Sequence, residues 1–407
     1  MKVLIVSQYF WPENFRINDL ASELNILGHD ITIITGYPNY PEGDVFSEFI
    51  KDKNFYSNYN GVDIIRIPIL ARGKNNFKLV LNYLSFIFSA SFLGLWKLRN
   101  KNFDIIFVFE PSPITVGLPA ILFKKIKGAP MIFWALDLWP ENLQVMGVIK
   151  SKILISFFSW LASFIYRNSD LILGQSKGFV DRISTYCHDS KNVKYFPSWA
   201  EEVYSDESFV LAPEVDYRDD LFNIVFAGNI GEAQDFPSIL DAAENLKDEK
   251  VRWIILGNGR TYQWVNDEIS KRKLESSVIL LGQFPIERMP SFYAHAQALL
   301  VSLKSDKLLS LTIPAKVQSY LLANIPIIGM LDGDGARVIK ESKGGILSPA
   351  GDSFSLANSI RSMIMMDEKK INNMVENGKK YAQDEFDRVR LIKLLESWMK
   401  DLANKNH

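Results

Sequence analysis

The sequence is poor in the residues that build disulfides and metal sites. Its 407 residues include one cysteine, Cys187, which excludes an intramolecular disulfide and a thiolate metal cluster. No two of the four histidines have the helical spacing typical of metal ligands; they are His29, His188, His295 and His407. The 46 basic and 47 acidic residues leave a net charge of −1. Without a positive field, a nucleic-acid partner is not indicated.

The first residues, MKVLIVSQYF, lack the long apolar stretch and small-residue cleavage site of a signal peptide, so we expect a cytoplasmic protein. A later segment, Leu79–Trp96, has no charged residue over 18 positions, and Lys97, Arg99 and Lys101 follow it. A buried helix fits this pattern, and so does a helix lying against an anionic membrane. A true span fits least, because a strand pattern, FDIIFVF, resumes within a few residues.

Short apolar runs alternate with helical patterns along both halves of the chain, which is typical of parallel sheets with crossover helices. We therefore predict an α/β fold of two Rossmann-like domains facing a cleft, at residues 1–200 and 201–384. Between them, the acidic and proline-containing segment 197–222 has the composition of a linker. A helix at 385–405 is expected to pack back on the first domain. The predicted strands are Val3–Ser7, Asp30–Thr35, Asp63–Ile67, Ile105–Phe109, Met131–Ala135, Leu171–Gly174, Asn223–Ala227, Val251–Leu256, Val278–Leu281, Ala298–Val301 and Ile325–Met330.

Glycine turns follow three predicted strands of the second half. They are GNIG from Gly228, GNGR from Gly257 and GQFP from Gly282. Such turns let backbone N–H groups approach a diphosphate, although a βα turn often uses glycine for steric reasons alone. None of them is G-x-G-x-x-G, so nicotinamide or flavin binding is not indicated.

Two lysines, Lys304 and Lys316, fall in loops on the same side of the predicted sheet. Lys316 is the more unusual, because it stands at the start of a helix, where the dipole already carries positive charge. A lysine there is consistent with an anion, most simply a phosphate, bound at the helix N-terminus. A solvated surface lysine is the other interpretation, and under both interpretations we expect Lys316 to be exposed.

In the first half, Glu13 and Asn14 follow the first strand, and Asp137 follows the Met131–Ala135 strand. Asn14 fits an N-cap, and Glu13 could complement the helix dipole. Asp137 is a candidate polar anchor or acid/base residue. The tetrapeptide WPEN occurs at Trp11 and again at Trp139, but the flanking residues do not match.

Five segments together resemble the retaining GT-B glycosyltransferases of family four. They are VSQYFWPENFRINDLASEL, GHDITIITGYPNYPEG, DLWPENL, AGNIGEAQDF and SLTIPAKVQSYLLANIPII. The sequence is most similar to transferases of bacterial O-antigen and capsule clusters that move N-acetyl-L-fucosamine from a uridine diphosphate donor. The resemblance implies a UDP-sugar donor and a polyprenyl-diphosphate-linked sugar acceptor. It also implies a protein peripheral on the inner face of the inner membrane.

The resemblance places the donor on the second domain and the acceptor on the first. Lys304 and Lys316 would offset the diphosphate charge, and the turn at Gln283 and Phe284 would hold uracil. The expected catalytic residues are Glu13, Asp137 and Lys304, with Glu110 a further candidate nucleophile. The expected substrate-binding residues are Asn14, Gly228, Asn229, Gly231, Gln234, Gly257, Arg260, Gln283, Phe284, Lys316, Gln318 and Ser319.

The sequence departs from the family at one motif. Relatives carry two glutamates eight positions apart, but here Ser319 occupies the second position, and no glutamate lies between Asp306 and Lys340. The ribose contact would then fall to Gln318 or Ser319. No cofactor and no metal ion are expected, because lysines and backbone N–H groups can stabilise a leaving diphosphate. A metal requirement would instead point to Asp306, Asp332 and Asp334.

Two other functions share a two-domain α/β architecture. A sugar-nucleotide 2-epimerase would need several carboxylates and histidines around the donor sugar, in which these loops are poor. A periplasmic-type binding protein, which is not an enzyme, would need a signal peptide.

Overall fold

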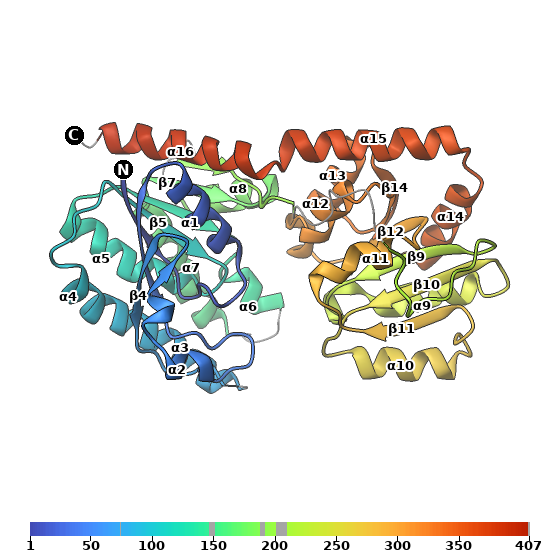
Figure 1. Ribbon diagram of the computed structural model, residues 1–407, viewed down its shortest axis with the longest axis horizontal. Helices are drawn as coiled ribbons and strands as arrows, with labels where there is room; N and C mark the ends of the chain where they lie inside the picture. Colours follow the sequence, from blue (N-terminus) through green and yellow to red (C-terminus); the bar gives the residue numbers. More distant parts are fainter. Residues whose placement is uncertain (74, 146–150, 188–191, 201–209, 406–407) are drawn as a thin grey trace. The chain divides into compact units, whose positions relative to one another are not determined.

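The computed structural model describes residues 1–407 except 74, 146–150, 188–191, 201–209 and 406–407 (Figure 1). The chain divides into two compact units. Unit 1 comprises Met1–Pro197 and Arg388–His407, and unit 2 comprises Ser198–Asp387. The sequence predicted divisions after residues 200 and 384. Part of the linker expected at 197–222 lies outside the described residues.

Unit 1 is built on an eight-stranded sheet of order β3-β4-β2-β1-β5-β6-β7-β8, parallel except for the β3–β4 pair. Its central strands are continuous apolar runs because both faces of the sheet are covered. In β1, for example, all residues after Lys2 are buried. The strands are β1 (Lys2–Val6), β2 (Asp30–Gly36), β3 (Asn58–Tyr59), β4 (Val62–Ile67), β5 (Ile105–Glu110), β6 (Met131–Ala135), β7 (Leu171–Gly174) and β8 (Val193–Tyr195).

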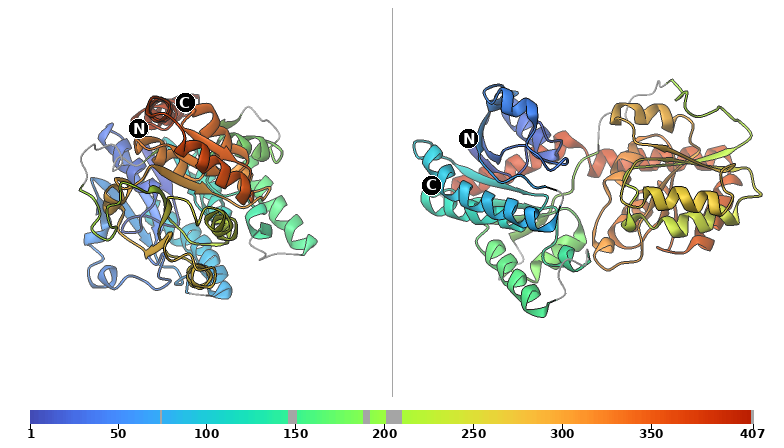
Figure 2. Two further views of the ribbon diagram at one scale, coloured as in Figure 1. Left: turned by 90° about the vertical axis from the view of Figure 1, so that its right-hand side faces the viewer. Right: turned by 90° about the horizontal axis from the view of Figure 1, so that it is seen from below.

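Helices cover both faces of this sheet (Figure 1 and Figure 2). Across the sheet, the connection from β1 to β2 runs in one direction, and the connections from β4 to β5, β6 and β7 run in the opposite direction. Right-handed crossovers therefore place α1 on one face and α3, α5 and α7 on the opposite face. The helices are α1 (Arg16–Ile26), α2 (Ser47–Lys51), α3 (Asn76–Ser89), α4 (Leu95–Leu98), α5 (Gly117–Lys127), α6 (Glu141–Val145), α7 (Lys152–Arg167), α8 (Lys177–Ser184) and α16 (Arg388–Lys405).

Unit 2 is built on a six-stranded parallel sheet of order β11-β10-β9-β12-β13-β14. Its strands are β9 (Phe222–Ala227), β10 (Val251–Leu256), β11 (Val278–Gly282), β12 (Ala298–Ser302), β13 (Ile327–Met330) and β14 (Gly345–Ser348). Its helices are α9 (Phe236–Asn245), α10 (Tyr262–Lys271), α11 (Met289–Tyr293), α12 (Ala315–Leu322), α13 (Gly333–Ser342), α14 (Ser353–Ile364) and α15 (Glu368–Glu385). Short 3-10 turns include η6 (Glu232–Gln234) and η8 (Leu309–Leu311).

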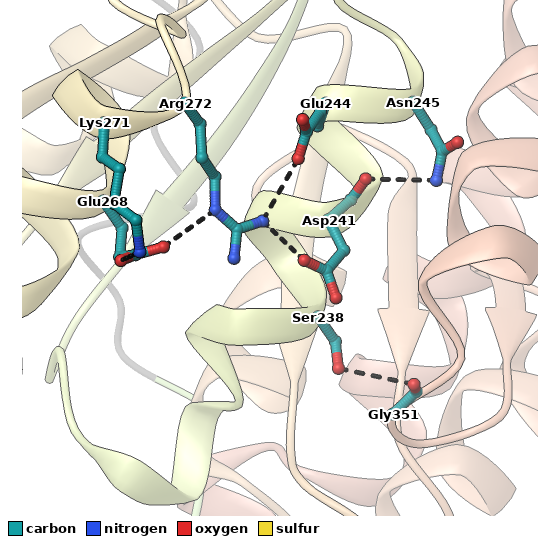
Figure 3. Close-up of polar contacts among 8 residues, drawn as sticks. All are labelled: Ser238, Asp241, Glu244, Asn245, Glu268, Lys271, Arg272 and Gly351. Atoms are coloured by element: carbon teal, nitrogen blue, oxygen red, sulfur yellow. Dashed lines mark hydrogen bonds and ion pairs between the residues drawn. The ribbon is translucent and has the colours of Figure 1, made fainter.

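An ion-pair network joins α9 and α10 on one side of unit 2 (Figure 3). The Arg272 guanidinium contacts Glu268 of α10 through Nε at 3.0 Å. It also pairs with Asp241 and Glu244 of α9. Because the arginine is mostly buried and its partners are shared, this network fixes the two helices more firmly than an isolated surface pair would.

Helix Asn76–Leu98, made of α3, the π-helical turn Ala90–Gly94 and α4, is long and apolar enough to cross a membrane. In unit 1 it lies on the sheet instead. Its packed side is made by small or buried residues at four-residue spacing: Asn82, Phe86, Ala90, Gly94 and Leu98. A Cβ at Gly94 would lie 2.4 Å from Ile34 Cδ1 of β2, so the glycine permits this close approach. The strands before and after the helix belong to one sheet, which is the geometry of a surface helix and not of a span.

The fold class and all eleven predicted strands are confirmed, with bounds that differ by at most two residues. Three strands were missed: β3, β8 and β14. Each has four residues or fewer and no strong apolar run, so a sequence pattern does not distinguish it from a loop.

Helix α16 packs against α1 within unit 1. His29 Nε2 and Glu396 Oε1 lie 2.9 Å apart, and Arg388 pairs with Glu23 at 3.0 Å. The Trp398 ring contacts Phe196 at 6.0 Å between centroids. The last helix of the chain is therefore a part of the first unit's core.

We predict that Leu395→Ala destabilises unit 1 and that Leu394→Ala does not. Leu395 is fully buried on α16, whereas its neighbour Leu394 is 37% exposed. Truncating a buried leucine costs about 2–5 kcal/mol, which for a unit of this size lowers the melting temperature by about 4 °C or more. Scanning calorimetry of the two variants measures the difference. Equal melting temperatures would contradict the packing described for α16.

Candidate functional site

The carboxyl ends of the parallel strands form one edge in each unit, and the candidate residues lie there. In unit 1, β2, β1, β5 and β6 are neighbours, so the loops after them are adjacent. In unit 2, the loops after β11, β10, β9 and β12 are adjacent in the same way.

Glu13 lies in the loop after β1, and its carboxylate points inward. Oε1 accepts hydrogen bonds from the backbone N–H groups of Asn39 at 2.9 Å and Tyr40 at 2.8 Å, and Oε2 accepts one from Phe10 at 3.2 Å. Burial raises the pKa of Glu13 to about 7. The residue thus fastens the loop after β1 to the loop after β2. The sequence instead predicted that Glu13 faces the substrate as a catalytic group.

Asn14 does not cap α1, as the sequence had suggested. The N-cap position is Phe15, which makes no side-chain cap hydrogen bond, and Asn14 is exposed. A buried asparagine in the first turn of α1, Asn18, binds this loop instead, and the sequence did not indicate it. It accepts from the Trp11 N–H at 3.1 Å and donates to the Glu13 carbonyl at 2.8 Å.

Two carboxyl groups meet where β5 and β6 end. Glu110, the last residue of β5, is fully buried, and its Oε2 accepts from the Asp137 N–H at 3.3 Å. Its Oε1 has no hydrogen-bond partner among the described residues. Burial, and then the charge of Asp137, raise the pKa of Glu110 well above its ordinary value. We infer a Glu110 side chain that is neutral at neutral pH.

Asp137 differs from Glu110 in having polar partners. Burial raises the pKa of Asp137 to about 6, and hydrogen bonding from the Asn142 and Ser112 side chains lowers it in part. Burial also raises the pKa of Tyr83 on α3, and hydrogen bonding from Ser112 lowers it in part. Ser112 has φ 119°, a strained conformation for a residue with a side chain and one that is frequent at functional sites. Asp137 is therefore mostly ionised at neutral pH, beside the buried Glu110 carboxyl group, whose pKa is raised well above its ordinary value.

Three residues of this edge escaped prediction: Ser112, Tyr83 and Tyr9. Tyr9 is buried, and its hydroxyl has no hydrogen-bond partner among the residues described. The sequence EPSP directly after a buried strand was the available signal for Ser112. Tyr83 lies in the uncharged helix and Tyr9 in the first loop, where no local pattern marks them.

In unit 2 the three glycine turns pack directly on one another. Gly228 N–H donates to Leu256 O at 2.9 Å, and Gly257 N–H donates to Gly282 O at 2.7 Å. Gly257 has φ +138°, and a Cβ there would lie 1.8 Å from the Gly228 carbonyl oxygen. No other residue fits this position without moving the turn after β9. Because Gly257 has no side chain, the turn after β10 does not cover the backbone of the turn after β9 at Gly228.

Lys316, the second residue of α12, lies over Gly228. A Cβ at Gly228 would be 2.5 Å from Lys316 Cε, so a side chain there would displace the end of the lysine, and the φ of +138° at Gly228 also favours glycine. The ammonium lies 3.4 Å from the centroid of the Phe226 ring, and burial lowers the pKa of Lys316 to about 7. It has no hydrogen bond or ion pair with any residue the structure describes. Lys316 is thus partly buried, and the expectation that it is exposed was wrong.

Tyr320 holds α12 in this position. Its hydroxyl accepts a hydrogen bond from the Ala227 N–H at 3.0 Å, at the end of β9. The α12 N-terminus has no side-chain cap, so its first N–H groups remain available beside Lys316. Gln318 and Ser319, expected at the ribose, are both buried within unit 2. Gln318 Oε1 lacks a hydrogen-bond partner among described residues.

The remaining predicted residues of unit 2 surround the turn after β9. Lys304 donates its backbone N–H to Ala233 O at 2.9 Å, and Ser302 Oγ donates to Gln234 O at 2.7 Å, which together hold η6 against the end of β12. Asn229 Nδ2 contacts Gln234 Oε1 at 3.3 Å. These bonds bring Lys304, Asn229, Gly231 and Gln234 to one place. Farther along the edge, Arg260 and Gln283 are exposed, and Phe284 packs on Phe292 at 4.6 Å.

The carboxylates named as possible metal ligands are each engaged elsewhere. Asp306 Oδ1 accepts from the N–H groups of Leu308 and Leu309. Asp332 and Asp334 have Asp-x-Asp spacing, but Asp332 Oδ1 accepts from Ala350 N–H at 3.2 Å, and Asp334 pairs with Arg337 at 2.8 Å. Within the described residues, no group of three or more His, Cys, Asp or Glu side chains could hold a metal ion.

Comparison with known families covers both units. Residues 14–199 match the family model "Glycosyl transferase 4-like domain", and residues 213–381 match "Glycosyl transferases group 1".

Two curated relatives have related descriptions. The chain is 27% identical over 311 residues to a probable glycosyltransferase, WbjE, of Pseudomonas aeruginosa, covering 74% of this chain and 73% of the relative. It is 26% identical over 274 residues to a putative colanic acid biosynthesis glycosyl transferase, WcaI, of Escherichia coli K12, covering 64% and 66%.

Solved structures show the same fold at low identity. Anabaena HepE in complex with UDP has a TM-score of 0.71 at 12% identity, covering 98% of this chain and all of that one. WaaG, a glycosyltransferase involved in lipopolysaccharide biosynthesis, has a TM-score of 0.67 at 13% identity, covering 98% and 99%.

We predict that Glu110→Gln raises thermal stability at pH 8 and leaves it nearly unchanged at pH 4.5. Glutamine imitates the neutral carboxyl group. In the folded wild type the pKa of Glu110 is raised well above its ordinary value of 4.5. Between that value and the folded pKa the unfolded chain binds fewer protons than the folded chain, so the stability of the wild type falls as pH rises above about 4.5. The loss is at most about 1.4 kcal/mol per pH unit. The melting-temperature difference between variant and wild type, followed from pH 4.5 to 8, tests this. A difference independent of pH would contradict a neutral Glu110.

Proposed function

Because glycosyltransferase family models match both units, we propose that the chain transfers a sugar from a UDP-sugar donor to a polyprenyl-diphosphate-linked sugar acceptor in O-antigen or capsule synthesis. N-acetyl-L-fucosamine is the sugar we propose, from the resemblance of the motifs. The observation that carries the donor assignment is Lys316, a partly buried ammonium with no anionic partner among the described residues, lying over Gly228. The relatives' descriptions, and the UDP bound to HepE, support the same class of reaction.

Unit 2 offers what a departing diphosphate requires. As the bond to the sugar breaks, negative charge grows on the β-phosphate, and fixed donors stabilise it without reorganisation. Lys316 supplies a charge, and the uncapped start of α12 supplies backbone N–H groups. In the glycine turn after β9, the Gly228 and Ile230 N–H groups already donate to Leu256 O and Asn258 O, so the N–H groups of Asn229 and Gly231 remain for the phosphate. We propose that these groups act without a divalent cation.

Unit 1 offers the groups for the acceptor. Of the three carboxylates at its edge, Glu13 is occupied by backbone N–H groups and Glu110 is buried in its neutral form. Asp137, with a pKa of about 6, is the one that suits a general base or a nucleophile at neutral pH. We propose retention of configuration. It can arise by attack on the leaving-group face, where the diphosphate oxygen takes the acceptor proton, or by double displacement through Asp137.

A 2-epimerase is less well supported by the site. His29 is bonded to Glu396, and His295 Nε2 lies 3.0 Å from the Ala212 carbonyl oxygen. Neither of these histidines lies at the strand ends that form the candidate site. The described part of the chain therefore presents no imidazole for proton transfer at the donor sugar.

We propose that the enzyme is cytoplasmic and acts on the inner face of the inner membrane, where its acceptor lies. The outward side of helix Asn76–Leu98 carries exposed apolar side chains, among them Phe77, Phe88 and Trp96. Exposed residues of α7, Phe157 and Trp160, form a second apolar area on the same face of the sheet. Apolar surface of this extent on a water-soluble unit is typical of a binding face.

Transfer can be tested by incubating the protein with UDP-sugars and a polyprenyl-diphosphate-linked acceptor. We expect glycosylated lipid and UDP as products, with activity retained in excess chelator. Release of a free epimer would favour the 2-epimerase. Loss of activity in chelator, restored by magnesium or manganese, would contradict metal independence.

Lys316→Ala should weaken UDP binding about 10- to 150-fold, because one charge-assisted contact contributes about 1.5–3 kcal/mol. Lys316→Glu should bind more weakly still, since it places a negative charge against the phosphate.

The wild-type affinity should also fall as pH rises above 7. Burial lowers the pKa of Lys316 to about 7, so at higher pH the free protein must take up a proton on binding. Lys316→Arg stays charged over this range and should show a flat profile. Calorimetric titrations with UDP at pH 6 to 9 measure both effects. Unchanged binding by Lys316→Ala would remove the diphosphate assignment.

A further inference from the structure

Arg72 is a partly buried cation at the edge of unit 1 that the carboxyl ends of the strands form. It lies in the loop after β4, whose neighbour in the sheet is β2, and β2 is the neighbour of β1. The loops after these three strands are therefore adjacent. The Arg72 guanidinium has no hydrogen bond or ion pair with any residue that the structure describes. An arginine held partly out of water without a carboxylate is a candidate for binding an anion.

Backbone contacts fix the position of Arg72. Its N–H donates to Asn39 Oδ1 at 3.0 Å, and the fully buried Asn39 donates Nδ2 to the Tyr37 carbonyl at 2.8 Å. The next residue, Gly73, donates its N–H to the Gly43 carbonyl at 2.8 Å. A Cβ at Gly43 would lie 2.7 Å from the Gly73 carbonyl oxygen, so the two loops approach too closely for a side chain there. A residue fixed in this way loses little freedom when a ligand binds.

The side chain of Arg72 rests on an aromatic ring. Its guanidinium carbon lies 5.0 Å from the centroid of the Tyr40 ring. The Tyr40 ring in turn lies 5.5 Å from that of Tyr9 and 5.2 Å from that of Phe15, between centroids. Contact with a ring restricts a guanidinium but leaves its charge and its N–H donors free for a phosphate.

Glu13 lies in the same group of loops and does not pair with Arg72. Its oxygens accept hydrogen bonds from the backbone N–H groups of Asn39 and Tyr40. Burial raises the pKa of Glu13 to about 7, and the arginine whose charge lowers it in part is Arg66. Arg72 is thus left without a counter-ion among the described residues.

The Tyr9 hydroxyl is a second polar group of these loops that lacks a partner. Tyr9 is 3% exposed, and its hydroxyl has no hydrogen-bond partner in the described part of the chain. Burial raises the pKa of Tyr9, and the charge of Arg72 lowers it in part, so the two groups lie near each other. Buried hydroxyl groups are rarely left without a partner, and an exception calls for a bound water or ligand.

Tyr83 of α3 relates Arg72 to the candidate base. Burial raises the pKa of Tyr83, the charge of Arg72 lowers it in part, and the charge of Asp137 raises it further. Charges act appreciably on one hydroxyl only from within about 10 Å. The cation and the carboxylate therefore border one region of unit 1.

We propose that Arg72 binds the diphosphate of the lipid-linked acceptor, with the Tyr9 hydroxyl as a further donor to it. The inference rests on the proposed function and adds the residue that recognises the charge of the acceptor. The acceptor carries its attacking hydroxyl and its diphosphate in one molecule, which suits a carboxylate and a cation that border one region. The diphosphate of the donor is assigned to Lys316 in unit 2, so the anion held near Asp137 is that of the acceptor.

The test is calorimetric binding of farnesyl diphosphate, a short prenyl diphosphate, to the full chain saturated with UDP. UDP fills the donor site, so the probe reports a second diphosphate site. Arg72→Gln should weaken its binding about 10- to 150-fold, through loss of a charge-assisted contact. Arg72→Lys should weaken it less, because it keeps the charge but not the paired donors. Farnesol, which lacks the phosphates, should bind the wild type and Arg72→Gln equally.

The matched control is Arg99→Gln. It removes the same charge from an arginine that also lies beside a ring, 4.6 Å from the centroid of Trp96. Arg99 is close in sequence to Lys101, which bonds Asp63 near the first residue of β4, at the opposite end of that strand from the Arg72 loop. We expect less than a threefold effect on farnesyl diphosphate binding. Equal losses from Arg72→Gln and Arg99→Gln would overturn the proposal.

Tyr9→Phe gives a second measurement. It removes no hydrogen bond between described residues, so the melting temperature should not fall. Farnesyl diphosphate should nevertheless bind about 2- to 12-fold more weakly, the effect of one neutral hydrogen bond. Unchanged binding would contradict the role proposed for the hydroxyl.

Two further outcomes separate this site from related ones. UDP binding by Arg72→Gln should equal that of the wild type; a loss would place the arginine at the donor and overturn the proposal. Release of farnesyl diphosphate by phosphatidylglycerol in detergent would show a general site for lipid headgroups and also overturn it. Failure of the wild type to bind UDP concerns the proposed function, whereas failure to bind farnesyl diphosphate with UDP binding intact concerns this site alone.

Discussion

The contact between Gly257 and the Gly228 carbonyl is the constraint on which the unit 2 site depends. A side chain at Gly257 would overlap that oxygen, so the turns after β9 and β10 can stack only through glycine. The stacked turns leave the space above Gly228 empty of side chains from the sheet, and Lys316 of α12 fills it. Tyr320 then joins α12 to the end of β9. Backbone geometry in one loop thereby determines where a charge from another element is held.

In unit 1, the edge formed by the carboxyl ends of the strands carries acidic residues, whereas the corresponding edge of unit 2 carries a lysine. The Glu13 carboxylate accepts hydrogen bonds from backbone N–H groups of the loop after β2. The buried Glu110 carboxyl group accepts one from the Asp137 backbone N–H. Of the three, Asp137 is the one whose pKa is lowered by hydrogen bonding from side chains, those of Asn142 and Ser112. Burial shifts the pKa of all three groups upward, to about 7 for Glu13 and about 6 for Asp137. The Glu13 oxygens already accept hydrogen bonds from backbone N–H groups, which is why Asp137 is the residue we propose for proton transfer. In the function we propose, unit 2 supplies a cation for the leaving phosphate and unit 1 supplies a carboxylate for the attacking hydroxyl.

The sequence predicted the strands well because both sheets are covered on both faces, which turns each long strand into an apolar run. It placed Lys316 at a helix start correctly, but its burial depends on Phe226 and Gly228, about ninety positions earlier. The inward turn of Glu13 likewise depends on backbone groups of Asn39 and Tyr40. Local patterns locate such residues at a strand end or helix start. They do not reveal partners that only the fold brings near, and for the same reason Tyr83 and Ser112 went unnoticed.

The central claim is that Lys316 and the turn at Gly228 hold the diphosphate of the donor. A crystal structure of the protein with UDP bound tests it most directly. The account predicts a β-phosphate oxygen within about 3 Å of Lys316 Nζ, beside backbone N–H groups of the turn after β9. A diphosphate bound elsewhere, with Lys316 still resting on Phe226, would contradict it.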